Sequence, residues 1–179
     1  MRLFLDACVL FPVATREILR AYAEAGGFAP LWSARVMEEW ARAARQKLNE
    51  EAIARGDIAL WRAAFEGEVS GYEEREGAIF LPDMADIHVA AAAAHGNADA
   101  VLTFNIRDFP LREMRVLNLS RLHPDEYFVA RWRDDRGRLA EALTPLSQRA
   151  QAEGVSFRAF LKRASLPRLG KAWEAAADG

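Results

Sequence analysis

Strand-like and helix-like hydrophobic patterns alternate along the first two thirds of the chain. The apolar run RLFL ends at Asp6 and predicts a strand over 2–6, followed by a helix from about 13 to 25. Ser33 comes just before apolar residues at helical spacing, including Val36 and Trp40. This arrangement predicts an amphipathic helix with a serine N-cap.

The alternation continues toward the C-terminus. The expected elements are a helix over 50–67, a strand over 78–82 (AIFLP), a helix over 83–95, a strand over 98–104 and a short strand over 114–119 (MRVLNL). Strands that alternate with helices are typical of a parallel sheet covered on both faces. After Pro124 only helical patterns remain, around 125–133, 139–153 and 156–164. An all-helical appendage is therefore expected to follow the α/β part.

Composition places the chain among ordinary globular proteins. Of its 179 residues, 51% are hydrophobic and 28% are charged, and this length suits one well-filled core rather than two ordinary domains. No apolar run approaches the roughly 18 residues of a membrane span, and Asp6 interrupts the first apolar run early. We expect a cytoplasmic protein without a membrane partner. Cys8 is the single cysteine, so it is expected to be a structural thiol.

The charge distribution is more informative than the net charge of −2. Residues 1–119 carry 13 Lys and Arg against 18 Asp and Glu, whereas residues 120–179 carry 11 against 8. The balance is therefore −5 in the first part and +3 in the second. Basic residues outside an acidic pocket could hold a nucleic-acid backbone; the alternative is a solvated helical face.

Four carboxylates lie where predicted strands or helices begin or end: Asp6, Glu39, Asp86 and Asp108. Residues at the carboxyl ends of parallel strands converge on one edge of the sheet, where ligands of such folds bind. A shared metal site would explain all four. Asp6 supports this interpretation best, because an acid that closes an apolar strand is costly to desolvate without a partner.

Each of the other acids also has a simpler explanation. Asp83 could cap the helix that follows it, and Asp86 could be a first-turn acid favoured by the helix dipole. Asn105 and Asp108 could be turn residues ahead of Pro110. Capping and metal binding do not exclude each other, so both interpretations stay open for Asp86.

Periodicity does not separate Glu38 from Glu39, because both flank the apolar stripe of the helix that begins after Ser33. His88 and His95 are seven residues apart rather than the three or four that bring two imidazoles to one zinc ion on a helix. His123 stands apart from both. We expect structural or surface roles for all three histidines.

The combination of four motifs in order resembles the PIN-domain family. The motifs are FLDACVLFP, SARVMEEWARA, LPDMADIHVAAAA and VLTFNIRDFP. The likeness covers about residues 1–128 and is greatest to the bacterial branch of toxin-like (VapC-like) ribonucleases from type II toxin–antitoxin pairs. It implies a three-layer α/β/α fold with a central parallel sheet over 1–128. Residues 129–179 would then form a helical C-terminal extension packed on the core.

The resemblance also assigns roles to residues. Asp6 matches the acid that closes the first strand, and Glu39 matches the helical acid of the family. Asp86 matches the acid that opens the alanine-rich helix, and Asp108 matches the acid after the T-x-N of the fourth motif. These four would bind metal and support catalysis. The residues expected to contact substrate or to support the ligands from behind are Asp83, Thr103 and Asn105.

The implied activity is hydrolysis of RNA phosphodiester bonds with Mg²⁺ or Mn²⁺, hard cations that prefer oxygen ligands. The implied partners are RNA, a possible antitoxin protein and further copies of the chain in a homo-oligomer. A catalytically silent PIN-fold module that binds nucleic acid or protein is the main alternative.

A phosphotransferase or phosphatase with Asp6 as its nucleophile is a second rival. Such enzymes usually carry another Asp two residues later, where this chain has Cys8. They also need a lysine near the site, and the chain has only Lys47, Lys162 and Lys171. Both features disfavour this rival.

Overall fold

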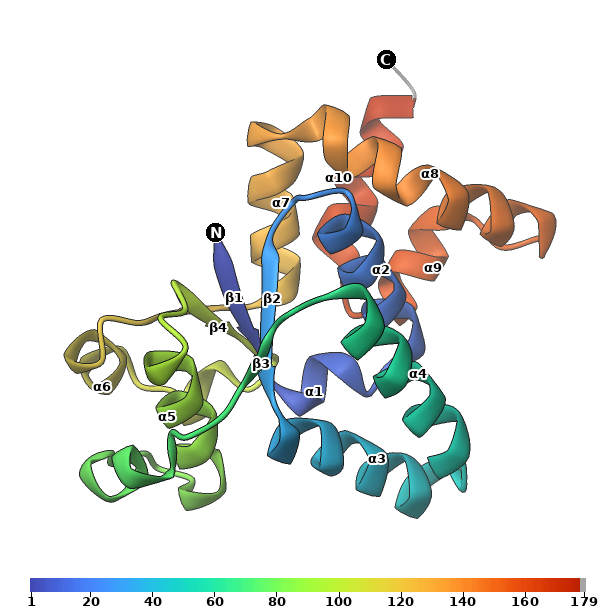
Figure 1. Cartoon of the computed structure of the whole chain (residues 1–179). Coiled ribbons are helices and arrows are strands. Elements are labelled where there is room, and N and C mark those ends of the chain that lie inside the picture. The colour runs from blue at the N-terminus through green and yellow to red at the C-terminus, as the bar shows by residue number, and fades with distance from the viewer. Residues whose placement is uncertain (178–179) are drawn as a thin grey trace. The chain divides into compact units, whose positions relative to one another are not determined.

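The computed structural model describes residues 1–177 and contains a five-stranded, fully parallel sheet in the order β3-β2-β1-β4-β5 (Figure 1). The predicted α/β class with a central parallel sheet is confirmed. The strands are β1 (Arg2–Leu5), β2 (Ala29–Ser33), β3 (Glu68–Val69), β4 (Ala100–Leu102) and β5 (Ser120–Leu122).

The uninterrupted apolar run near the N-terminus forms β1, the central strand of the sheet. Phe4 pairs with Leu31 of β2 on one side and with Val101 of β4 on the other. Leu3, Phe4 and Leu5 are fully buried. A parallel strand covered on both faces has no solvent-facing side, so apolar residues do not alternate with polar ones along it.

The chain forms two compact units, and the first holds the sheet. It comprises residues 1–11 and 28–123. The alanine-rich helix α5 packs against β1, β2, β3 and β4, and its small side chains at 90–93 are fully buried. The helical elements of this unit are α1 (Ala7–Leu10), α3 (Ala34–Leu48), α4 (Glu51–Ala64), η1 (Glu73–Ala78), η2 (Met84–Asp86), α5 (Ile87–His95), η3 (Ile106–Asp108) and α6 (Leu111–Val116).

The second unit combines residues 12–27 with residues 124–177, and all its regular elements are helices. The Thr15 hydroxyl donates to the Ala164 carbonyl at 2.9 Å, and the Tyr22 hydroxyl donates to Asp135 at 3.1 Å. These bonds tie α2 to the C-terminal helices. The helices are α2 (Val13–Glu24), α7 (Pro124–Asp134), α8 (Arg136–Ala152), α9 (Phe157–Arg163) and α10 (Pro167–Ala177). The predicted domain division after residue 128 stays a prediction.

Two expected strands are wrong. Residues 78–82 form no strand: Ile79 and Leu81 are buried while Phe80 is 78% exposed, an alternation without a partner strand. The segment 114–119 instead completes α6 and a turn in which Asn118 has φ +56°, and β5 begins directly after it. The other three strands of the sheet are β2, β3 and β5, which the hydrophobic pattern did not predict. Within residues 1–177, no helix is long and apolar enough to cross a membrane.

Asp125 provides a test of how the second unit is held together. Its buried carboxylate on α7 accepts hydrogen bonds from the backbone N–H groups of Arg168 and Leu169, each at 3.0 Å, at the start of α10. Asp125→Ala should lower the free energy of unfolding by about 1–3 kcal/mol, because it leaves helix-terminal donors unsatisfied. Urea denaturation measures the change.

The matched control is Asp134→Ala on the same helix. Its side chain is 58% exposed and pairs with Arg131, so its loss should stay below about 1 kcal/mol. Equal losses in the two variants would contradict the capping role of Asp125.

Candidate functional site

The order of the strands switches direction between β1 and β4. The chain adds β2 and β3 on one side of β1 and returns to add β4 and β5 on the other. Ligands of open α/β sheets bind at such a switch in strand order, outside the carboxyl ends of the strands. Asp6 directly follows β1, and Thr103 directly follows β4, so both residues lie at this point.

Asp6 ends β1 because it is also the N-cap of the next helix. Its backbone is extended, with ψ 150°, and its side chain accepts a hydrogen bond from the Cys8 N–H at 3.5 Å. The Asp6 N–H donates to the Leu102 carbonyl at 3.2 Å, which holds the residue against the end of β4. Only 5% of Asp6 is exposed. The carboxylate is therefore buried and fixed where the strand order switches.

Thr103 and Cys8 orient the Asp6 carboxylate further. The Thr103 hydroxyl accepts from the Asn105 N–H at 2.9 Å and donates to Asp6 Oδ2 at 2.6 Å. The Cys8 thiol donates to the same oxygen at 3.1 Å. Burial and the charge of Asp6 raise the pKa of the Cys8 thiol to about 12. Cys8 is therefore a protonated donor rather than a nucleophile.

Asp108 lies on the short helix η3, and main-chain hydrogen bonds fix its position. Its N–H donates to the Asn105 carbonyl at 3.0 Å, while the Asn105 residue itself is exposed. The guanidinium of Arg121 on β5 donates to the carbonyls of Ile106 and Phe109, the latter at 2.7 Å. Arg121 thus clamps both sides of Asp108.

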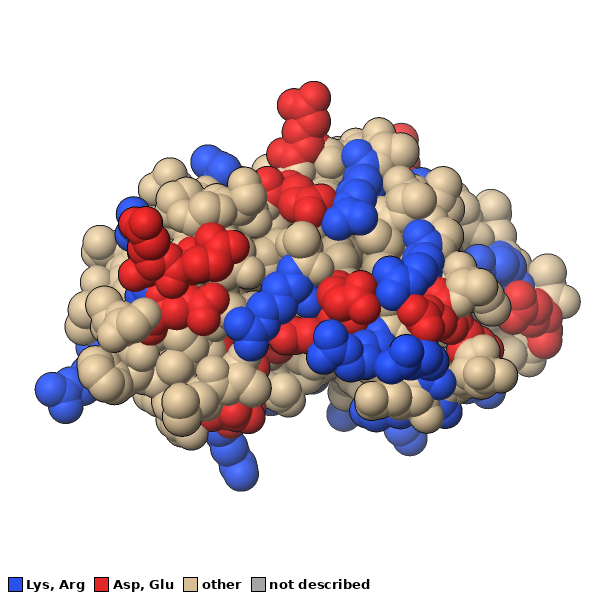
Figure 2. All heavy atoms as spheres, turned by 60° about the horizontal axis from the view of Figure 1, so that its bottom comes forward, with Lys and Arg blue, Asp and Glu red and all other residues tan. Residues whose placement is uncertain are grey.

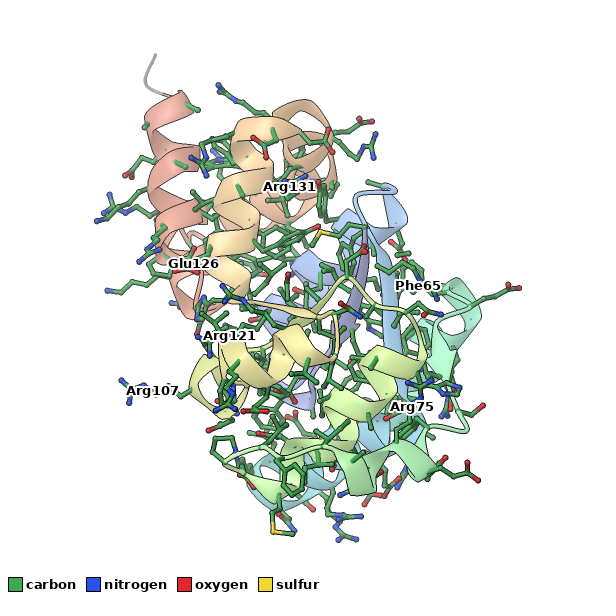
Figure 3. The ribbon with its side chains drawn as sticks, turned by 90° about the vertical axis from the view of Figure 1, so that its left-hand side faces the viewer. Phe65, Arg75, Arg107, Arg121, Glu126 and Arg131 are labelled. Carbon is green, nitrogen blue, oxygen red and sulfur yellow. The ribbon has the colours of Figure 1, made fainter. Side chains whose placement is uncertain are left out.

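Figure 3 shows the two arginines near this loop in different roles. Arg121 turns in against the loop, whereas Arg107 extends away from it. Arg107 is exposed. The clamp on the loop therefore comes from the neighbouring strand and not from the loop's own arginine.

The sequence left open whether Asp83 and Asp86 cap a helix or bind a metal, and in the structure only Asp83 acts as a cap. The Asp83 carboxylate accepts from the Ala85 N–H at 2.8 Å and caps η2. Asp86 makes no cap hydrogen bond and is half-buried before α5. The pKa of the Asp86 carboxyl is raised from 3.8 to about 7, first by burial and then by the charges of Asp6, Asp83 and Asp108, in that order. The negative charges of Asp6, Asp83 and Asp108 therefore disfavour ionisation of the Asp86 carboxyl.

The two adjacent glutamates of α3 have different surroundings. Glu38 is exposed, and both its oxygens accept hydrogen bonds from Arg55 at 3.2 Å. Glu39 lies with Oε1 2.9 Å from Nε2 of His88 and 3.5 Å from Nε of Arg35. The spacing of the histidines relative to one another gave no indication that His88 contacts Glu39.

The predicted residues are therefore linked in three ways. Asp83, Asp86, Asp6 and Asp108 interact through their charges. Thr103 touches Asp6 directly, whereas Asn105 contributes backbone groups. Glu39 contacts His88 on α5, two residues beyond Asp86.

At the end of the molecule where the carboxyl ends of the strands lie, the surface carries acidic side chains interspersed with Lys and Arg (Figure 2).

The chemistry of this set suits a hard divalent cation. Carboxylate oxygens are the preferred ligands of Mg²⁺ and Mn²⁺. The pKa of Asp86 is raised by burial and by neighbouring negative charges, which a cation would neutralise. Within residues 1–177, no three His, Cys, Asp or Glu side chains are already arranged to hold a metal ion. The fit rests on donor type and charge rather than on a formed coordination sphere.

Comparisons with known proteins identify the family. The chain is similar to a crystal structure of VapBC2 from Rickettsia felis bound to a DNA fragment from their promoter, with 18% identity and a TM-score of 0.45. That likeness covers 69% of this chain and 98% of the other. No curated protein matches. The family model described as PIN domain matches residues 2–107. This range is more than half of the chain and carries the sheet through β4, so the predicted three-layer α/β/α fold is confirmed and the chain belongs to the PIN-domain family.

Proposed function

We propose that the protein is a divalent-metal-dependent endoribonuclease that hydrolyses RNA phosphodiester bonds. The observation that carries the proposal is the raised pKa of Asp86, which arises from burial and from Asp6, Asp83 and Asp108 at the switch in strand order. A carboxyl group whose pKa is raised by burial and by neighbouring charges is typical of functional sites. Membership of the PIN-domain family supports a nuclease.

In this proposal Asp6, Glu39, Asp86 and Asp108 hold Mg²⁺ or Mn²⁺. The metal supplies activation of a water molecule and stabilisation of charge on the leaving oxygen. Asp6 is oriented by Thr103 and Cys8, and Asp108 by the Arg121 clamp. Asp83 supports the neighbouring Asp86 without binding the ion. The side chain of Asn105 is exposed at the rim, where it can contact substrate.

The biological setting is proposed from the same four motifs. Their resemblance to toxin-like ribonucleases supports a role as the toxin of a toxin–antitoxin pair, with an antitoxin protein as partner. A homo-oligomer stays a prediction.

A catalytically silent PIN-fold binding module is the alternative function. The observation in its favour is that Glu39 already contacts both His88 and Arg35. A paired carboxylate must exchange or share its contacts before it can bind a cation. Cleavage by site variants separates the two functions.

The first functional prediction concerns cleavage of a labelled single-stranded RNA with Mn²⁺. Asp6→Asn, Glu39→Gln and Asp108→Asn should each lower the rate by more than the roughly 10–100-fold typical of residues that only support metal ligands. Each change removes an anionic oxygen while it keeps the size of the side chain. Glu38→Gln is the matched control, since Glu38 points to Arg55, and its rate should stay near that of the wild type.

Chelator should abolish cleavage in the wild type. Residual cleavage that is equal in all variants and insensitive to chelator would reveal a contaminating nuclease. That outcome would favour the binding module.

A second prediction uses the pKa of Asp86. The folded-state value of about 7 exceeds the ordinary 3.8, so the unfolded chain releases this proton first. The resulting loss of stability begins as pH rises above 3.8 and is complete above about 7. In chelator, Asp86→Asn should therefore melt at a higher temperature than the wild type at about pH 8, and the difference should vanish toward about pH 4.

Thermal unfolding followed by circular dichroism checks this pH dependence. Glu66→Gln is the control, because Glu66 is exposed and lies beyond the end of α4, away from the carboxylates that raise the pKa of Asp86. A melting temperature of Asp86→Asn below that of the wild type at the higher pH would refute a destabilising charge at Asp86.

A further inference from the structure

A buried histidine contacts one of the proposed metal ligands. His88 lies on α5, is 1% exposed, and has Nε2 2.9 Å from Oε1 of Glu39 on α3. The Glu39 side chain is 33% exposed. The contact therefore joins an almost fully enclosed imidazole to a carboxylate that still reaches solvent.

The surroundings of the imidazole decide where its proton lies. Nδ1 of His88 is buried and has no hydrogen-bond partner among residues 1–177. A proton on Nδ1 would bury an unpaired donor, and the unprotonated Nε2 would face a carboxylate oxygen. Placing the proton on Nε2 avoids both penalties, since an unpaired acceptor is tolerated better than an unpaired donor. His88 therefore donates its Nε2–H to Glu39.

This hydrogen bond restricts a flexible side chain. A glutamate loses rotamer freedom when it binds a cation, and a partner that fixes it beforehand lowers this loss. The nearest oxygen of Glu39 to both His88 and Arg35 is Oε1. The second oxygen, Oε2, is then the one that can turn toward a cation while Oε1 keeps its donor.

The position of His88 along α5 adds to this effect. It follows Asp86 by two residues, so the hydrogen bond ties α3 to the segment that carries another proposed ligand. We propose that His88 is a positioning residue, which donates Nε2–H to Glu39 and fixes that carboxylate for binding a divalent cation. This inference rests on the proposed function of the site.

The test is Mn²⁺ binding to the full-length protein, measured by isothermal titration calorimetry. His88→Leu removes the donor and should weaken binding roughly 10–100-fold, as is typical for partners that orient metal ligands. His88→Gln places an amide N–H near the position of Nε2 and should stay within a few-fold of the wild type. His95→Leu, at an exposed position on the same helix, is the control and should bind as the wild type does.

A double-mutant cycle shows whether His88 acts through Glu39. Glu39→Gln should weaken Mn²⁺ binding, and adding His88→Leu to it should cause no further loss. A similar loss from His88→Leu in both backgrounds would mean general structural damage and would overturn the proposal. Unchanged binding by His88→Leu alone would overturn it as well.

Two safeguards keep the result interpretable. If His88→Leu does not fold, His88→Asn replaces it, because asparagine places its amide near Nδ1 rather than Nε2 and should weaken binding where glutamine does not. Equal affinities of the Asn and Gln variants would overturn the proposal. A wild-type protein that binds no Mn²⁺ would refute the proposed metal-dependent function and, with it, the positioning role of His88.

Discussion

The structure depends on the placement of several negative charges at one edge of a buried parallel sheet. Asp6 is 5% exposed. Burial of Asp86 and the charges of Asp6, Asp83 and Asp108 together raise the pKa of Asp86 to about 7. Like charges in a poorly solvated setting destabilise a fold unless protons or cations compensate them. Hydrogen bonds from Thr103, Cys8 and Arg121 hold Asp6 and the backbone around Asp108 in place.

The means of holding them differ from residue to residue. Asp6 is fixed by capping a helix and by donors from Thr103 and Cys8. Asp108 is fixed through its backbone, because Arg121 binds the carbonyls on either side of it. Glu39 contacts a buried imidazole. Because these hydrogen bonds hold the carboxylates before a cation is present, less side-chain freedom is lost when a cation binds.

Features that depend on local sequence could be predicted, whereas features that depend on distant pairing could not. Ser33 caps α3 as its spacing indicated, with Oγ accepting from the Val36 N–H at 3.3 Å. The AIFLP segment has strand-like residues but no partner strand, and the sheet takes β2 and β3 instead. The contact between His88 and Glu39 depends on how α3 and α5 approach each other, which no single-helix pattern contains. The grouping of α2 with the C-terminal helices is likewise set by tertiary contacts.

The central claim is that these carboxylates form one divalent-cation site. Electron paramagnetic resonance measures it most directly, because free Mn²⁺ gives a strong signal that decreases when the ion binds protein. Addition of wild-type protein should remove Mn²⁺ from the free signal, and the Asp6→Asn, Asp86→Asn and Asp108→Asn variants should each remove much less. Equal loss of signal in the wild type and in a variant with all three substitutions would contradict the account.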